Sequence, residues 1–427
     1  MALTLLSFTF MGFLVIGVPV AFAIGLSSIT AIMYEDLPLA VAFQQMTSGM
    51  NAFSFLAIPF FIFTGELMLY GGIADRIVAF AKSLVGHVRG GLGMSNVVAC
   101  TLFGGVSGSP VADVSAMGSV MIPMMKREGY HADYAVNVTT HAALVGALMP
   151  TSHNIIIYTL AAGGKVSIAA LIAAGVVPAL ILTACNLAAA YFVARSRGYP
   201  AGTFPGWHIV FRSLVAAAPG LFVVVLIIAG ILSGVFTATE SAAVAVLYAL
   251  ALTVFVYRSL TWDQFVRAAS KAVKTTGVVL LLIGISATFG YLISFYGVAE
   301  KTGQLMASVS TEPWAIFLMV NIILFVLGTF LDMAATILIC TPIFLPICMQ
   351  YGMGPVQFGM VLLLNCALGL NTPPVGTTQF VGCAIGGVSV GTVMRTIWPF
   401  YGALLAALAL VTYVPAFSLW LPGVLLN

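Results

Sequence analysis

Charged residues are scarce in this 427-residue sequence: Asp, Glu, Lys and Arg together make up 6% of it, while 61% is hydrophobic. Soluble globular domains carry roughly 25% charged residues, and so few charges do not cover a water-exposed surface. A cytosolic enzyme, a nucleic-acid-binding protein and a disordered chain are therefore excluded. The apolar runs are long rather than alternating in segments of about 10 residues, which excludes a membrane β-barrel. The composition predicts an all-α polytopic membrane protein.

Several functional motifs are also missing. The six cysteines form no CxxC pair and no Cys/His metal spacing, so they are interpreted as small packing residues. The chain has no GxxxxGK[ST] phosphate loop, which argues against ATP as an energy source. The first apolar run, 3–33, lacks a basic segment before it and is too long for a signal peptide, which predicts a first membrane span.

The apolar stretches give a topology, because about 20 apolar residues cross a bilayer. The predicted crossings are 3–33, 54–70, 132–163, 168–194, 213–233, 241–257, 275–295, 356–386 and 396–417. Two of them, 132–163 and 356–386, contain a polar break with proline and are predicted to be broken helices. Two further stretches, 92–126 and 314–349, are interrupted by polar residues and are predicted to be re-entrant hairpins. The segment 36–52 is predicted to be a surface helix.

The basic residues test this topology. With both hairpins returning to the side they entered from, one face receives only Lys165 and Lys301. The other face receives Arg76, Lys82, Arg89, Lys126, Arg127, Arg195, Arg197, Arg212, Arg258, Arg267, Lys271, Lys274 and Arg395. A bias of 13 to two marks the second face as cytoplasmic. It predicts a cytoplasmic N-terminus and a periplasmic C-terminus.

The two halves of the chain resemble each other at offsets of 219 to 225 residues. The matching pairs are Gly72 with Gly297, Asn96 with Asn321, Asp113 with Asp332, His141 with Asn365, and Pro150 with Pro374. The topology places the hairpins' bases on opposite faces, so the repeats are predicted to be inverted, as in secondary transporters. The predicted units are scaffold helices and a surface arm in 1–91, transport elements in 92–194, a second scaffold in 195–313 and second transport elements in 314–427.

The polar breaks suggest the chemistry. Non-helical backbone inside a membrane is tolerated only against protein or a wet cavity. The hairpin tips, 104–113 and 328–332, and the helix breaks, 146–154 and 369–379, offer carbonyl and hydroxyl oxygens of the kind that a hard cation such as Na⁺ prefers. The half-helices after the breaks present N-termini, which favour an anion. Together they suit a cation-coupled importer of anions.

Simple helix capping is the competing interpretation. Ser109-Pro110 fits an N-cap followed by a first-turn proline, with Asp113 in the first turn. Thr329-x-x-Asp332 fits a capping box. Capping and ion coordination are compatible, and a carboxylate inside a membrane is a functional candidate by default. Both interpretations stay open for Asp113 and Asp332.

Other residues are assigned by position. The substrate candidates follow the two breaks: Thr151, Ser152, His153, Asn154, Thr377 and Thr378. Glu66 and Glu240 are expected to have a structural or gating role, whereas His141 and His153 face either the cavity or a neighbouring helix.

Enzyme interpretations are weak. The segments 105–108 and 387–391 match the GxSG and GxSxG patterns of serine hydrolases, but short glycine motifs arise easily in a chain with 43 glycines. Asp113 and Asp332 lack the GxGD signature of intramembrane aspartyl proteases. An intramembrane protease therefore stays a remote alternative, and no enzyme activity is expected.

Four stretches resemble one known family. They are LAIPFFIFTGE (56–66), SGSPVAD (107–113), GVFTATESAAV (234–244) and GLNTPPVG (369–376). They are similar to the large membrane subunit of tripartite ATP-independent periplasmic (TRAP) transporters, and the resemblance covers essentially the whole chain. The break at 149–154 is more similar to the sialic-acid branch than to the C4-dicarboxylate branch, whereas Ala238 stands where the family usually has proline.

The resemblance implies an elevator-type, Na⁺-driven importer of organic acids in the bacterial inner membrane. It implies a small four-helix membrane subunit and a periplasmic substrate-binding protein as partners. By position it implies two Na⁺ sites, each joining a tip to a break: Ser107, Ser109, Asp113, Gly146, Met149 and Pro150 in the first, and Gly328, Asp332, Gly369, Thr372 and Val375 in the second. A stand-alone Na⁺/carboxylate symporter is the alternative, and a membrane scaffold protein without transport activity is disfavoured.

Overall fold

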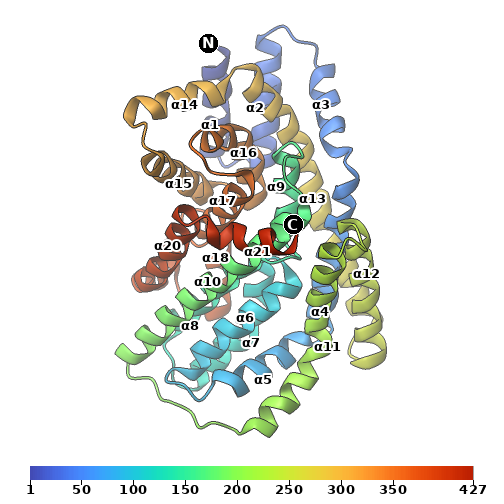
Figure 1. Ribbon diagram of the computed structural model, residues 1–427, viewed down its shortest axis with the longest axis vertical. Coiled ribbons are helices and arrows are strands. Elements are labelled where there is room, and N and C mark those ends of the chain that lie inside the picture. The colour runs from blue at the N-terminus through green and yellow to red at the C-terminus, as the bar shows by residue number, and fades with distance from the viewer. Residues whose placement is uncertain (427) are drawn as a thin grey trace.

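The computed structural model describes residues 1–426, and these residues are helical almost throughout (Figure 1). The first half consists of α1 (Ala2–Val15), α2 (Val20–Tyr34), α3 (Ala40–Met50), η1 (Phe53–Leu56), α4 (Ala57–Tyr70), α5 (Ile73–Val85), α6 (Gly91–Ser107), α7 (Pro110–Arg127), α8 (Ala132–Ala143), η2 (Leu144–Leu148), α9 (His153–Ala161) and α10 (Ile168–Ser196). The second half consists of α11 (Trp207–Leu232), α12 (Ala238–Ala251), η3 (Leu252–Val256), α13 (Trp262–Phe295), α14 (Val298–Val309), α15 (Pro313–Phe330), α16 (Met333–Gln350), α17 (Pro355–Leu370), α18 (Thr377–Gly386), α19 (Val390–Met394), α20 (Trp398–Tyr413) and α21 (Ala416–Leu425).

Within this part of the chain, seven helices are long and apolar enough to cross a membrane, or nine if each of two bent pairs is one span. The prediction of an all-α polytopic membrane protein is confirmed.

The first predicted crossing, 3–33, is wrong as a single helix. The chain turns at 16–19, where Gly17 has φ +88° and Pro19 precedes α2. The helices α1 and α2 pack against each other, and with 14 and 15 residues neither is long enough to cross a hydrocarbon core of about 30 Å unless the bilayer thins. Two packed helices return the chain to the side on which it began. A cytoplasmic N-terminus, which required one crossing here, therefore loses its basis.

Both predicted hairpins are present. In the first, α6 ends at Ser107 and is followed by Gly108, whose φ of +62° is readily adopted only by glycine, and α7 starts with Ser109 as N-cap and Pro110 in the first turn. In the second, α15 ends at Phe330 and α16 starts after Asp332. By length alone, α15 and α16 could each span a membrane. A helical hairpin returns to its starting side in either case, so the charge count is unaffected.

The two predicted broken helices are also present. The first bends by 51° between α8–η2 and α9, around the break at 149–152. The second is interrupted at 371–376, between α17 and α18, where the Pro373–Pro374 peptide bond is cis. Their breaks lie opposite the hairpin tips, which positions the candidate site.

The repeat is visible in local details. Gly72 and Gly297 are both left-handed N-caps, of α5 and α14. Asn96 in the first hairpin donates to Thr139 in the adjoining broken helix at 2.5 Å, and Asn321 in the second hairpin accepts from Asn365 at 2.8 Å. The inverted orientation of the repeats stays a prediction.

The proposed match of Asp113 with Asp332 is shifted by one helical turn. The N-cap of α7 is Ser109, four residues before Asp113, whereas Asp332 is itself the N-cap of α16. The capping box beginning at Thr329 is also wrong, because the Thr329 hydroxyl donates to Val326 O at 2.7 Å. The cap registers pair Ser109 with Asp332 at an offset of 223, close to the 224 or 225 of the other matches.

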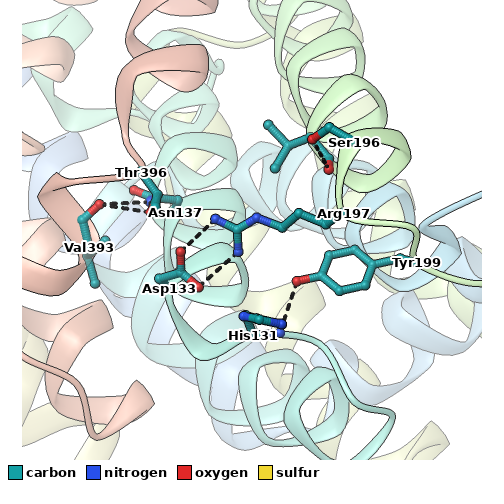
Figure 2. Close-up of polar contacts among 9 residues, drawn as sticks. His131, Asp133, Asn137, Ser196, Arg197, Tyr199, Val393 and Thr396 are labelled. Atoms are coloured by element: carbon teal, nitrogen blue, oxygen red, sulfur yellow. Dashed lines mark hydrogen bonds and ion pairs between the residues drawn. The ribbon is translucent and has the colours of Figure 1, made fainter.

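The loop between α10 and α11 is tied to the transport elements (Figure 2). Arg197 donates two hydrogen bonds, of 3.0 and 2.7 Å, to the carboxylate of Asp133 at the start of α8, and these bonds raise the pKa of Arg197. The Tyr199 hydroxyl accepts from the backbone N–H of His131 at 3.0 Å. Asn137 continues the network on α8, donating to Thr396 at 3.1 Å. These contacts fix the start of the broken helix α8 against the loop between α10 and α11 and the loop between α19 and α20.

Candidate functional site

The first hairpin tip and the first helix break meet at two glycines. A β-carbon at Gly104 would lie 3.0 Å from both the Cα and the N of Gly146. A β-carbon at Gly146 would lie 3.5 Å from the carbonyl carbon of Ser109. Only residues without side chains let the two backbones approach this closely. The sequence predicted Gly146 and Ser109 for this site but not Gly104.

Asp113 lies at this junction. It is fully buried, and a β-carbon on either Gly104 or Gly146 would come within 2.8 Å of its Oδ2 atom. Its Oδ1 atom accepts a hydrogen bond from the Ser107 hydroxyl, whereas Oδ2 has no hydrogen-bond partner. Capping does not explain Asp113, because no N-cap function falls on it. A buried carboxylate oxygen without a donor, beside the backbone of a tip and a break, fits a site for a hard cation.

The rest of the first break closes over the tip. A β-carbon at Gly108 would lie 2.4 Å from the carbonyl oxygen of Thr151 and 2.6 Å from the backbone nitrogen of Ser152. The Thr151 hydroxyl donates to Gly105 O at 3.0 Å. Thr151 and Ser152 are buried. These two predicted substrate residues therefore belong to the tip–break junction, whereas the backbone of Met149 bonds within the break, accepting from the N–H of Ser152 at 2.9 Å.

The second junction repeats this close approach. A β-carbon at Gly369 would lie 2.4 Å from the carbonyl oxygen of Gly328. The backbone N–H of Val375 donates to Thr329 O at 3.2 Å, which joins the second break to the second tip. The structure thus brings together the predicted residues Gly328, Gly369 and Val375.

Side chains around the second break hold it in shape. The Tyr401 hydroxyl contacts Asn371 O at 3.0 Å and the Thr372 hydroxyl at 2.9 Å. The Thr378 hydroxyl donates to Leu370 O at 2.6 Å and also contacts Asn371. Thr378 is fully buried in this network, so it supports the break instead of lining a cavity. Tyr401 was not predicted, because nothing local in its sequence marks it as a neighbour of a break 30 residues earlier.

Asp332 differs from Asp113 in its surroundings. Its Oδ1 accepts from the backbone N–H of Ala335 at 2.8 Å, which is ordinary N-capping. Asp332 also lines a cavity, which Asp113 does not. The two aspartates predicted to be equivalent thus occupy different places, one in a junction and one at a cavity wall.

The cavity lies between the two hairpin tips and has a volume of about 500 Å³. Its wall combines both tips, the first turns of α9 and α18, and the helices α4 and α13; the polar residues in it are Glu66, Ser107, Ser109, Ser115, His153, Asn154, Lys271, Thr275, Asp332 and Thr377. Three predicted substrate residues, His153, Asn154 and Thr377, are among them. A cavity of this size with converging polar groups is typical of a small-molecule site.

Of the remaining candidates, Glu66 lines the cavity, whereas Glu240 and His141 do not. Glu66 lines the cavity and forms an ion pair with Lys271. Glu240 is exposed and forms a capping box with Thr237 at the start of α12, so its role is structural. His141 is fully buried among helices, with Nδ1 2.8 Å from Asn137 O, and does not line the cavity.

In residues 1–426, no group of three or more His, Cys, Asp or Glu side chains is placed to hold a metal ion. The oxygens at both junctions come instead from backbone carbonyls and hydroxyls. The first junction adds one carboxylate, that of Asp113. Such a donor set suits Na⁺ better than a transition metal.

Paired helical hairpins, broken helices and a polar cavity between them define this chain as a membrane transport protein. Residues 7–417 match the family described as "Tripartite ATP-independent periplasmic transporter, DctM component". The chain belongs to this family, whose members are transporters and not enzymes. The predicted family is thereby confirmed.

Individual relatives agree with this assignment. The chain is 40% identical over 415 residues to "Uncharacterized protein YgiK" of Salmonella typhimurium, covering 96% of this chain and 94% of that protein. It is 36% identical to the sialic acid TRAP transporter large permease protein SiaM of Vibrio cholerae, covering 98% of each chain. It is 34% identical to the C4-dicarboxylate TRAP transporter large permease protein DctM of Rhodobacter capsulatus, covering 96% of each. Both transport branches are thus represented at similar identity.

A solved structure shares the fold. The YdaH transporter of Alcanivorax borkumensis superposes with a TM-score of 0.61 over 90% of each chain, at 12% sequence identity. This likeness concerns the fold alone.

Proposed function

We propose that this chain is the permease subunit of a Na⁺-coupled importer of organic acids in the bacterial inner membrane. The observation that carries the proposal is the pairing of two tip–break junctions with one shared cavity. The first junction supplies a buried, unpartnered carboxylate oxygen at Asp113, and the cavity supplies polar side chains and two half-helix N-termini. A cation in a junction would hold tip and break together, and this would complete the cavity wall for an anion.

The substrate class is carboxylates such as sialic acid or C4-dicarboxylates. Relatives with names for both substrates resemble this chain about equally, so family membership does not select one. The half-helix N-termini beside His153, Asn154 and Thr377 favour an anionic group in the cavity. The hairpins and broken helices would move as an elevator against α4 and α13.

The orientation follows from charge. The thirteen basic residues of one face belong in the cytoplasm. Residues 1–34 carry no charged side chain, so the charge count does not place the N-terminus by itself. With α1 and α2 as a packed pair, the same rule puts both the N-terminus and the C-terminus in the periplasm.

The partners would be a small four-helix membrane subunit and a periplasmic substrate-binding protein. Support comes from relatives named as single permeases of larger size: the chain covers 65% of the isethionate transporter permease DctMQ of Oleidesulfovibrio alaskensis and 67% of the sialic acid transporter permease SiaT of Haemophilus influenzae. The uncovered third of those proteins would be long enough for a fused small subunit.

Reconstitution tests the tripartite arrangement. Proteoliposomes containing this chain are assayed for uptake of labelled sialic acid and succinate, with and without a small four-helix subunit and a periplasmic binding protein of the same family from the source organism. Uptake only when all three are present supports the proposal. Full uptake by this chain alone would identify a stand-alone symporter instead.

A further inference from the structure

One ion pair in the cavity wall joins the scaffold helices α4 and α13. Lys271 on α13 places its Nζ 2.8 Å from Oε1 of Glu66 on α4. The side chain of Glu66 is 8% exposed, whereas that of Lys271 is 47% exposed. Among the described residues that line the cavity, Lys271 is the only lysine or arginine. Glu66 lies inside the predicted span 54–70, and an ionisable residue within a membrane span is costly and a functional candidate.

The pair is not satisfied as a closed structural bridge. Glu66 Oε2 is buried and has no hydrogen-bond partner. A lysine ammonium has three donors, and the contact with Glu66 uses one of them, while the half-exposed side chain borders the cavity. A pair with one half-exposed partner contributes little net stability, because solvent screens the Coulombic attraction.

The position of the pair connects it to the moving parts. A β-carbon at Gly65, the neighbour of Glu66, would lie 3.3 Å from the Cα and the carbonyl oxygen of Ser107. The scaffold helix α4 therefore touches the first hairpin tip at this point. Asp332 of the second tip lines the same cavity, so Lys271 shares this cavity with both tips.

We propose that Lys271 is the cationic contact for the substrate's carboxylate, and that Glu66 is a positioning residue that holds the ammonium at the cavity wall and competes with the substrate for it. This inference rests on the proposed function and specifies its anion site. The half-helix N-termini bind the anion from the transport elements, and Lys271 binds it from the scaffold.

The test compares single variants with opposite expected effects. The probes are labelled sialic acid and succinate, and the one that the wild-type transporter accumulates is used. Lys271→Gln is expected to raise the KM of uptake at least about tenfold, since a charge-assisted hydrogen bond is lost. Glu66→Gln is expected to lower the KM, because the competing carboxylate is gone. The half-saturating Na⁺ concentration is expected to stay unchanged in both.

Two further variants serve as controls. Lys274→Gln removes an exposed lysine from the same helix, outside the cavity, and is expected to leave the KM unchanged. The charge-swapped double variant Glu66→Lys/Lys271→Glu retains an ion pair. It is expected to keep the raised KM, because the cation has moved from the half-exposed to the buried position.

The outcomes decide between a substrate contact and a structural bridge. The same change of KM in Lys271→Gln and Glu66→Gln, or restoration of wild-type KM by the charge swap, would overturn the proposal. If Lys271→Gln does not fold, Glu66→Gln decides, because a KM that does not fall contradicts competition for Lys271. If the wild type accumulates neither probe in a Na⁺ gradient, the proposed function fails, and the assignment of Lys271 fails with it.

Discussion

Replacing Gly369 by alanine probes the second junction directly. The added β-carbon would lie 2.4 Å from the carbonyl oxygen of Gly328, 2.5 Å from its carbonyl carbon and 2.8 Å from its Cα. Ordinary contact begins at 3.4 Å, so α15 and α17 must separate by about 1 Å. All three clashing atoms belong to the backbone, so no side-chain rotation relieves the contact.

The expected magnitude follows from this separation. Overpacking of a tight contact costs about 1–3 kcal/mol. If the bound cation requires the closed junction, this cost appears as weaker cation binding. At 1.4 kcal/mol per tenfold, the Na⁺ affinity should fall by about 5- to 150-fold.

Gly328→Ala is the matched control. Both glycines are in helices, so alanine raises helix propensity equally at the two positions. A β-carbon at Gly328 would have its nearest neighbour at 3.6 Å, which is ordinary contact. Any difference between the two variants therefore reports the backbone clash.

The assay is the thermal stability of the purified protein during a Na⁺ titration at constant ionic strength, with K⁺ as replacement. A ligand that binds only the folded state raises its stability in proportion to ln(1 + [L]/Kd). The Gly369→Ala curve should shift to higher Na⁺ concentration, whereas the Gly328→Ala curve should match the wild type. Coincident curves for both variants would refute the assignment of a cation site to this junction.

Three further predictions concern the aspartates, the topology and the fold. Asp113→Asn should raise the half-saturating Na⁺ concentration of uptake by about 5- to 150-fold, whereas Asp332→Asn should change it less, because asparagine caps a helix as well as aspartate does; equal effects of the two would contradict the different positions of these residues. Cysteine at position 127 should react with a membrane-impermeant thiol reagent only from the cytoplasm, and cysteine at 165 only from the periplasm, in place of Arg127 and Lys165; labelling from one side would reject the hairpin topology. Arg197→Ala should lower the free energy of unfolding by about 1–3 kcal/mol, since it leaves a largely buried aspartate without its two hydrogen bonds; unchanged stability in a denaturation assay would show that this pair is dispensable.

The elements with strong local signals were predictable from the sequence. Both hairpin tips and both helix breaks place glycine and polar residues inside apolar runs, three of the four also contain proline, and the structure has its turns there. Gly17 and Pro19 in the first apolar run carried the same signal. The prediction of one crossing was based on the overall hydrophobicity of 3–33 and did not take Gly17 and Pro19 into account. Residues 1–34 contain no charge that would have exposed the error.

The details of the site depend on tertiary contacts that short motifs do not specify. The resemblance placed Asp113 and Gly146 in one site, but the sequence gives no indication that Gly104 belongs to it or that Tyr401 holds the second break. The difference between Asp113 and Asp332 did leave a trace, because their offset of 219 residues is smaller than that of the other repeat matches. Four residues make about one turn of a helix. Asp113 therefore lies on the same helix face as the N-cap position that Asp332 occupies, but about one turn further along the helix axis.

Coupling of substrate accumulation to Na⁺ tests the central claim most directly. Proteoliposomes containing the chain and its two partners are loaded with K⁺, and uptake of the labelled substrate is followed after dilution into Na⁺ or choline buffer at clamped pH. The two cation junctions predict accumulation in Na⁺ and none in choline, with or without ATP. Undiminished uptake in choline would contradict the account.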